Sequence, residues 1–266
     1  MSRPQPRLLE IRDPLSTPGA QRLKRRLRRV EWIASAVNGV SFVALLTLTL
    51  VFLSRTPFAP LWTDFGGVVQ ARGQFPLAVT VLAFPLITSL FHAAQALDAY
   101  DFYQYGLVLG YTPHRWLEYA ITNGLITFDI FLLAGAGSVP LLLSALVLNA
   151  LMNFCGYLHE RANSARQESL GYLFLGFLPW LPLWLVPLVY YAESASRSPT
   201  YYGTAILGSF VISLLFPLPL VWRYYTSTER ARANYYTKVM YAVLSFTSKL
   251  YLGWVVVLGA ALTRAA

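Results

Sequence analysis

Charged and polar side chains inside apolar segments are the residues of this sequence best placed to do chemistry, and Lys249 is the clearest of them. It lies in the middle of YAVLSFTSKLYLGWVVVLGAAL, a stretch long enough to cross a membrane. An unpaired lysine at the centre of a spanning helix costs roughly 2.5–3.5 kcal/mol on insertion scales. Such a residue indicates a functional site, and the first question is which acid pairs with it.

Two acids in another apolar stretch, HRWLEYAITNGLITFDIFLL, are candidates for this partner. Glu118 lies in the half of its span that the long side chain of Lys249 can reach. A buried carboxylate stays ionised only beside a positive charge, so we predict a Lys249–Glu118 pair. Asp129 lies about three turns further on, nearer the other end of the span and at headgroup level, which makes it the weaker partner. A structural tie between two helices is the alternative interpretation of the pair.

Further polar residues in the spans should turn inward, because lipid cannot satisfy them. Ser245 lies one helical turn before Lys249 and on the same face. His92 lies in SLFHAAQAL, where a lone histidine is more often a packing residue than a proton carrier. Arg115, at the mouth of its span, is expected to snorkel to the interface. The remaining polar candidates are Asn38, Asn149 and Asn153, and the aromatic residues Trp180, Trp184, Phe210 and Phe216 are expected to face lipid or the core.

The composition predicts a membrane protein. Of the 266 residues, 56% are hydrophobic and only 12% are charged, whereas a soluble domain carries about 25% charged residues. The formal charge of +9 does not predict nucleic-acid binding, because the basic residues lie between apolar spans. Cys155 is the only cysteine, which excludes an intrachain disulfide and a cysteine-based metal site.

Seven spans are predicted, so the fold class is an all-α membrane protein with a seven-helix bundle. The predicted spans are 31–53, 76–103, 113–134, 138–160, 169–192, 201–226 and 234–262. Residues 1–30 form a basic tail, 31–262 the membrane domain, and 54–75 an external loop with a short β-hairpin. With the N-terminus cytoplasmic, sixteen lysines and arginines lie inside and four outside (Arg55, Arg72, Arg197 and Arg264). The positive-inside rule therefore predicts a multi-pass cell-membrane protein with its N-terminus inside and its C-terminus outside.

Several motifs resemble those of one family of retinal proteins. HRWLEY is similar to the Arg-Trp-x-Glu-Tyr signature of heliorhodopsins, and SLFHAAQ, NALMNFCGYLHE and VLSFTSKLYLGW resemble their second, fourth and seventh helices. The resemblance spans about residues 25–262 and includes the inverted orientation. It implies all-trans retinal bound covalently to Lys249 as a Schiff base, Glu118 as its counterion, and Ser245 as a hydrogen-bonding neighbour.

The same resemblance assigns roles to further residues and shows two departures. His92 matches a histidine of a cytoplasmic-side polar cavity, and four residues match positions that line the chromophore: Asn149, Met152, Gly156 and Trp180. Asn38 stands where many members have a second cavity histidine. Thr122 stands where members often have another small polar residue. Asp129 has no counterpart.

Three functions are compatible with these residues. The first is a heliorhodopsin-like photoreceptor that signals without pumping ions, as a homodimer in the lipid bilayer, through an unidentified cytoplasmic partner. The second is a light-driven proton or ion transporter or channel, for which acids along a path are few. The third is a retinal-free seven-span receptor or scaffold, which would leave Lys249 unexplained. The sequence shows no metal cluster, phosphate loop or nucleophile triad, so we do not expect an enzyme.

Overall fold

A computed structural model describes residues 18–52, 58–65, 68–99, 102–164, 170–226 and 230–263. Within these ranges, seven helical segments are long and apolar enough to cross a membrane. The helices are α1 (Pro18–Val51), α2 (Leu77–Ala96), α3 (Pro113–Leu133), α4 (Val139–Ser164), α5 (Gly171–Ser194), α6 (Thr200–Ser213), α7 (Leu218–Tyr225) and α8 (Arg230–Thr263). Two short helical turns complete the helical elements: η3 (Gln104–Leu109) and η4 (Ala195–Arg197).

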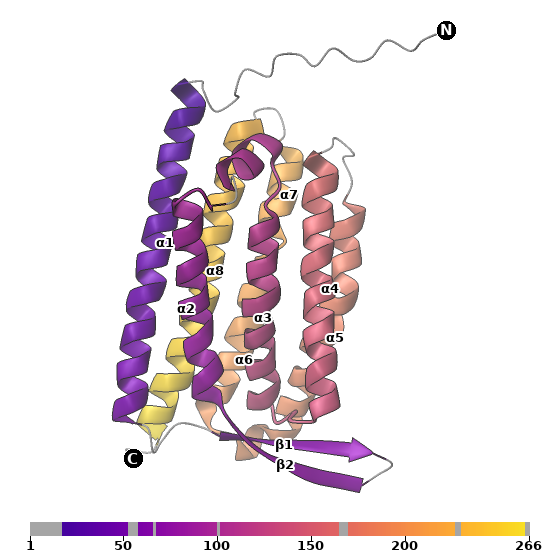
Figure 1. The fold of residues 1–266 in the computed structure, drawn as a ribbon. Coiled ribbons are helices and arrows are strands. Elements are labelled where there is room, and N and C mark those ends of the chain that lie inside the picture. The colour runs from indigo at the N-terminus through magenta and orange to yellow at the C-terminus, as the bar shows by residue number, and fades with distance from the viewer. Residues whose placement is uncertain are drawn as a thin grey trace.

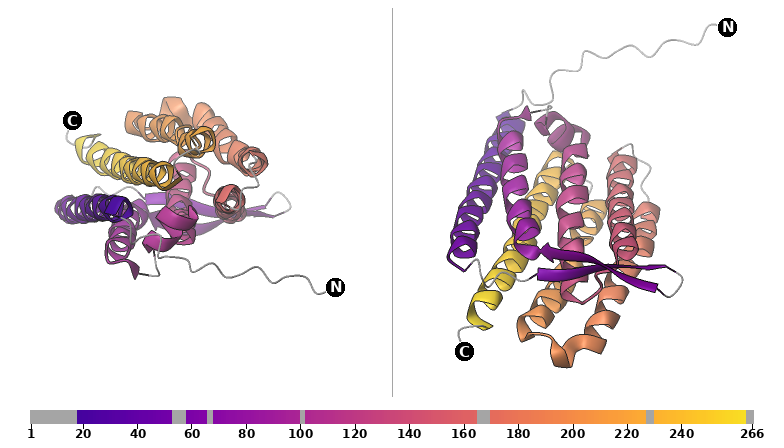
Figure 2. Two further views of the ribbon diagram at one scale, coloured as in Figure 1. Left: turned by 90° about the horizontal axis from the view of Figure 1, so that it is seen from above. Right: turned by 60° about the horizontal axis from the view of Figure 1, so that its bottom comes forward.

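The long helices stand side by side as one bundle (Figure 1). α8 is central: it packs against α1, α2, α6 and α7, and the view along the helix axes shows it between α1 and the α5–α6 side of the bundle (Figure 2). α1 and α8 have 34 residues each, which corresponds to about 51 Å of helix. Because the hydrocarbon core is about 30 Å thick, both helices extend beyond it.

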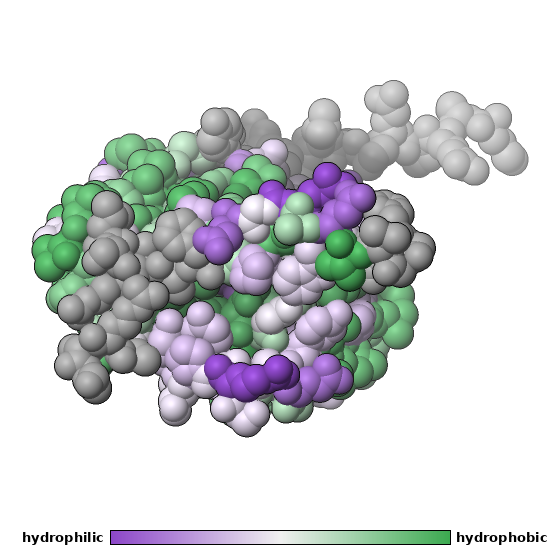
Figure 3. Space-filling model, turned by 90° about the horizontal axis from the view of Figure 1, so that it is seen from below, coloured by the Kyte–Doolittle hydropathy of each residue, from purple (hydrophilic) through white to green (hydrophobic). Residues whose placement is uncertain are grey.

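Two antiparallel strands lie across one end of the bundle, which we call the hairpin end (Figures 1 and 2). β1 (Phe58–Phe65) pairs with β2 (Val68–Pro76), with an irregular register between Leu61 and Trp62. The backbone N–H of Trp62 donates to the carbonyl of Gly137, at 3.1 Å, and this bond ties the hairpin to the turn between α3 and α4. The hairpin predicted within 54–75 is therefore confirmed. Hydrophilic side chains gather on this end face, with hydrophobic ones at its rim (Figure 3).

The second predicted span, 76–103, was too long at its C-terminal end. α2 ends at Ala96, and Asp98 adopts a left-handed backbone with φ of 61°. Its carboxylate accepts the backbone N–H of Tyr103 at 3.1 Å and pairs with Lys24 at 2.6 Å. These bonds draw the chain into the π-helical turn η3, so the connection folds over the bundle at the end opposite the hairpin.

The sixth predicted span, 201–226, is broken into α6 and α7. Turns separate Ser213 from Leu218, and Pro217 lies at the break. Proline has no backbone N–H and clashes with the preceding turn, which interrupts the helix. The first helix also begins earlier than its predicted span, at Pro18, whereas residues 1–17 of the predicted tail lie outside the described residues.

Candidate functional site

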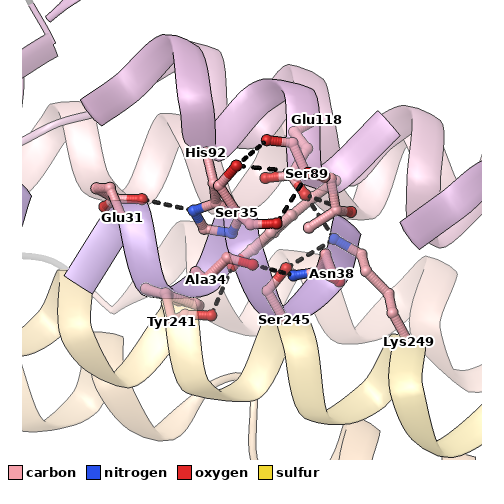
Figure 4. Close-up of polar contacts among 12 residues, drawn as sticks. Glu31, Ala34, Ser35, Asn38, Ser89, His92, Glu118, Tyr241, Ser245 and Lys249 are labelled. Atoms are coloured by element: carbon pink, nitrogen blue, oxygen red, sulfur yellow. Dashed lines mark hydrogen bonds and ion pairs between the residues drawn. The ribbon is translucent and has the colours of Figure 1, made fainter. Parts of the chain in front are cut away.

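Lys249 and Glu118 meet in the interior of the bundle. The ammonium of Lys249 on α8 donates to Glu118 Oε1 on α3 at 2.5 Å and to Ser245 Oγ, one turn earlier on α8, at 2.7 Å (Figure 4). Glu118 also accepts a hydrogen bond of 3.0 Å from the hydroxyl of Thr88 on α2. Lys249 is fully buried and Glu118 is 1% exposed. Three helices thus provide one buried ion pair together with its hydrogen bonds.

Thr122 and Asn38 take less direct parts in this region. Thr122, one turn after Glu118, donates its hydroxyl to the backbone carbonyl of Glu118 at 2.9 Å. Asn38 on α1 is fully buried, and its side-chain amide donates to the carbonyl of Ala34 at 2.8 Å. Among the described contacts, none joins Asn38 to Lys249 or to His92.

His92 is paired with an acid that the sequence reasoning missed. His92 Nδ1 on α2 lies 2.5 Å from Glu31 Oε2 on α1, and both side chains are at least 95% buried (Figure 4). A small cavity is lined by both residues and by Glu118, so the two pairs border the same space. Glu31 was overlooked because it lies two residues after Arg29 in a strongly basic stretch, where a charged residue is expected to lie in water.

Arg115 does not snorkel to the interface; that prediction was wrong. Its guanidinium donates to Glu160 Oε1 at 2.5 Å, and only 6% of Arg115 is exposed. The other oxygen of Glu160 accepts from Trp116 Nε1 at 2.8 Å and from the backbone N–H of Thr112 at 2.9 Å. Burial of the arginine is possible because this carboxylate, with its hydrogen bonds satisfied, lies beside it.

Asp129 lies in the half of α3 nearer the hairpin and is fully buried. It is hydrogen-bonded to the hydroxyl of Thr80 on α2, which also lies 3.0 Å from the carbonyl of Leu77. The Thr80 hydroxyl donates to Asp129 Oδ1, so this acid has a partner inside the bundle.

A largely apolar cavity lies beside the ion pair, lined by residues of α3 to α8. Asn149, Met152, Gly156 and Trp180 all line it, as do Trp184 and Phe216. Tyr119 and Ser248 also belong to its wall, and the ammonium of Lys249 lies over the Tyr119 ring, 5.4 Å from the centroid. The amine is therefore close to the cavity wall, although Lys249 is not itself a lining residue.

The residues of this cavity fit a long apolar ligand that forms an imine with a lysine. Its lining runs along α3 from Trp116 to Ile130, a rise of about 21 Å. At Gly156 a Cβ would collide with the ring of Trp116, so glycine allows α4 to approach the tryptophan at this wall. A buried amine can form the imine, and the adjacent carboxylate can balance the positive charge of the protonated imine.

Comparison with solved structures defines the class of the fold. The chain is similar to xanthorhodopsin, described as a light-driven ion pump with dual chromophore, with a TM-score of 0.67, 15% identity, and coverage of 94% of this chain and 96% of that one. The rhodopsin of Exiguobacterium sibiricum is similar with a TM-score of 0.67 and 14% identity, and the match covers 92% of this chain and 98% of that one. A light-driven proton pump from Leptosphaeria maculans is similar with a TM-score of 0.64 and 14% identity, and the match covers 90% of this chain and 95% of that one. The bundle therefore has the fold of microbial rhodopsins.

The family is shown by a second comparison. The heliorhodopsin family profile matches residues 25–261, and this chain belongs to the heliorhodopsin family. No curated protein matches it. Membership and fold together support a multi-pass membrane protein of the retinal photoreceptor type, with retinal as its chromophore.

Proposed function

We propose that this chain is a light sensor in which Lys249 binds all-trans retinal as a Schiff base and Glu118 is the counterion. The observation that carries the proposal is the buried 2.5 Å contact between Lys249 and Glu118 next to an apolar cavity. When bound, retinal supplies light absorption and isomerisation. Glu118 holds the positive charge at the Lys249 nitrogen, and Ser245 and Thr88 fix the positions of the two partners through hydrogen bonds.

The residues around the pair support a signalling role. Glu118, Glu31 and His92 border one small cavity, so a change of charge at Lys249 acts on the His92–Glu31 pair, which joins α2 to α1. Met152, Asn149, Gly156 and Trp180 would enclose the chromophore. The positive-inside count supports a cytoplasmic N-terminus, and the family resemblance supports a homodimer that signals to a cytoplasmic partner.

The test is the visible spectrum of the purified protein after expression with all-trans retinal. Wild type should show a visible band that bleaches with hydroxylamine, and Lys249→Ala and Lys249→Arg should lack it. The arginine variant keeps the positive charge beside Glu118, so loss of the band there cannot be ascribed to an unpaired acid. Lys238→Met is the matched control, because Lys238 is also buried on α8, and it should keep the band. A folded wild type without a band would refute the proposal.

Glu118→Gln tests the counterion separately. Removing the negative charge next to a protonated imine should shift the band to longer wavelength and abolish its colour change in acid. Asp129→Asn is the control, because Asp129 is buried on the same helix but bonded to Thr80. An unchanged spectrum in Glu118→Gln would assign the counterion to another residue.

Light-driven transport is the second candidate, and Asp129 is the observation that favours it. This buried acid lies toward the hairpin end, on the other side of Lys249 from the His92–Glu31 pair. Two similar solved structures are described as light-driven pumps. Illuminated cells in unbuffered medium decide between the candidates: we expect no light-driven pH change, and a change that a protonophore abolishes would establish transport.

A further inference from the structure

Two polar hydrogen atoms in the wall of the apolar cavity have no acceptor. Within the described part of the chain, Trp180 Nε1 on α5 and Ser209 Oγ on α6 are buried without a hydrogen-bond partner. Both residues line the cavity. A buried donor without a partner is unfavourable, and native proteins leave few such groups. Two of them in one ligand cavity therefore require an explanation.

The two groups lie on α5 and α6, which a ring contact joins directly beside Ser209. The ring of Phe210, the residue after Ser209, stacks on the ring of Trp180, with centroids 5.9 Å apart and planes inclined by 30°. This contact fixes the Trp180 side chain next to the stretch of α6 that contains Ser209. Ser209 is 7% exposed, so bulk water does not satisfy its hydroxyl.

Ser213, one turn further along α6, shows that the unpaired state of Ser209 is not a general property of serines in this helix. Ser213 also lines the cavity, but its hydroxyl donates to the carbonyl of Phe210 at 2.7 Å. A helical serine commonly makes such a bond to its own backbone. Ser209 makes none, so its hydroxyl remains available to a ligand.

The surroundings of the two groups do not favour a water molecule as their partner. A buried water typically makes about three hydrogen bonds, whereas the neighbouring cavity residues Leu183, Ile130 and Ile212 are apolar. A ligand atom needs fewer partners, because its own covalent frame fills the apolar space. A single oxygen on the ligand would satisfy both Trp180 and Ser209.

We propose that the cavity binds a retinoid whose ring carries an oxygen, as a hydroxyl or keto group, held by Trp180 and Ser209. The oxygen accepts a hydrogen bond from Trp180 Nε1. Ser209 donates a hydrogen bond to a keto group. With a ring hydroxyl it either donates or accepts the hydrogen bond. The oxygen belongs to the ring because the aldehyde end is consumed at Lys249. This inference rests on the proposed function, since it assumes retinoid attachment to Lys249.

A competition experiment tests the inference. Protein produced without retinoid is incubated with equal amounts of all-trans-retinal and all-trans-3-hydroxyretinal, and in a second mixture with all-trans-retinal and 4-ketoretinal. The bound retinoids are released as oximes and quantified by chromatography. We expect at least one oxygenated retinoid to be enriched about tenfold over retinal, which corresponds to about 1.4 kcal/mol.

Variants separate hydrogen bonding from shape. Ser209→Ala and Trp180→Phe should each reduce the enrichment to near one while still binding retinal. Ser213→Ala removes a hydroxyl that already has an acceptor, so it should keep the wild-type preference. Loss of the preference in Ser213→Ala to the same degree would overturn the assignment.

The remaining outcomes distinguish the two proposals. A visible band with retinal but no preference for either oxygenated retinoid overturns this inference and leaves the light-sensor proposal standing. The absence of a band with every retinoid, in folded protein, overturns both.

Discussion

Within the described residues, three ion pairs have both side chains buried, and they differ in what surrounds them. Lys249–Glu118 lies beside the apolar cavity, and His92–Glu31 shares a small cavity with Glu118. In Arg115–Glu160 the carboxylate has further donors, because Glu160 also accepts from Trp116 and the backbone of Thr112. Arg115 also lines that small cavity, but its partner Glu160 is held by hydrogen bonds from the start of α3.

Loss of the Glu160 charge is therefore expected to destabilise the fold. Glu160→Gln leaves the buried guanidinium of Arg115 without its carboxylate, which should cost about 3–5 kcal/mol. Thermal unfolding in detergent, followed by the helical circular-dichroism signal, measures this effect. Asp98→Asn is the control, because the Lys24–Asp98 pair is 34% exposed on both sides and exposed pairs contribute about 1 kcal/mol or less. Equal midpoints for the two variants would contradict the structural role of Glu160.

The sequence predicts some of these pairs better than others for a physical reason. Glu118 and Lys249 lie deep inside apolar stretches, where a charge is costly and so attracts attention. Glu31 begins its predicted span and Glu160 lies near the end of α4, each close to arginines, a setting in which charged residues usually face water. Their burial depends on which other elements pack against these parts of α1 and α4, and periodicity does not show that.

The connection between α2 and α3 is the element that sequence patterns described least well. Its aromatic residues extended the apolar pattern of α2, yet Phe102 and Tyr103 are buried in a separate small core with Leu27 of α1 and Leu107. Burial raises the pKa of the Tyr103 phenol above its ordinary value, so the ring stays neutral beneath the ammonium of Lys24. The seven spans and the hairpin, in contrast, follow directly from hydropathy and turn residues.

Gly110 is the point at which this connection turns into α3, and its substitution should be costly. Its φ is +81°, and a Cβ would meet the side chains of Arg223 and Asn234. Gly110→Ala should cost about 2–4 kcal/mol from backbone strain and overpacking together. Gly135 has a similar φ of +90° but nothing within 4 Å of a Cβ. Gly135→Ala should therefore cost only about 1–2 kcal/mol.

Thermal midpoints of the two glycine variants, measured by the same method, check this difference. A larger loss for Gly135→Ala would show that the contacts of Gly110 with Arg223 and Asn234 do not constrain the connection.

At the scale of the whole molecule, charge and length together predict how the bundle crosses the membrane. α1 extends beyond the hydrocarbon core, and its first turns expose Arg22, Arg25, Arg26 and Arg29. The hairpin lies at the opposite end of the bundle (Figure 1). An odd number of spans would put the two termini on opposite sides, and the lysine and arginine count predicts that the basic end lies in the cytoplasm.

Reporter fusions in bacterial cells test this orientation. Green fluorescent protein at the N-terminus should fluoresce, because it folds in the cytoplasm, and alkaline phosphatase at the C-terminus should be active, because it requires export. The reciprocal fusions, with phosphatase at the N-terminus and the fluorescent protein at the C-terminus, should both be silent. Replacing Arg22, Arg25, Arg26 and Arg29 by glutamine should weaken the bias and give mixed activities, since the positive-inside rule depends on charges within about 15–20 residues of a span. An active phosphatase at the N-terminus of the wild type would reverse the topology and place the His92–Glu31 pair toward the outside.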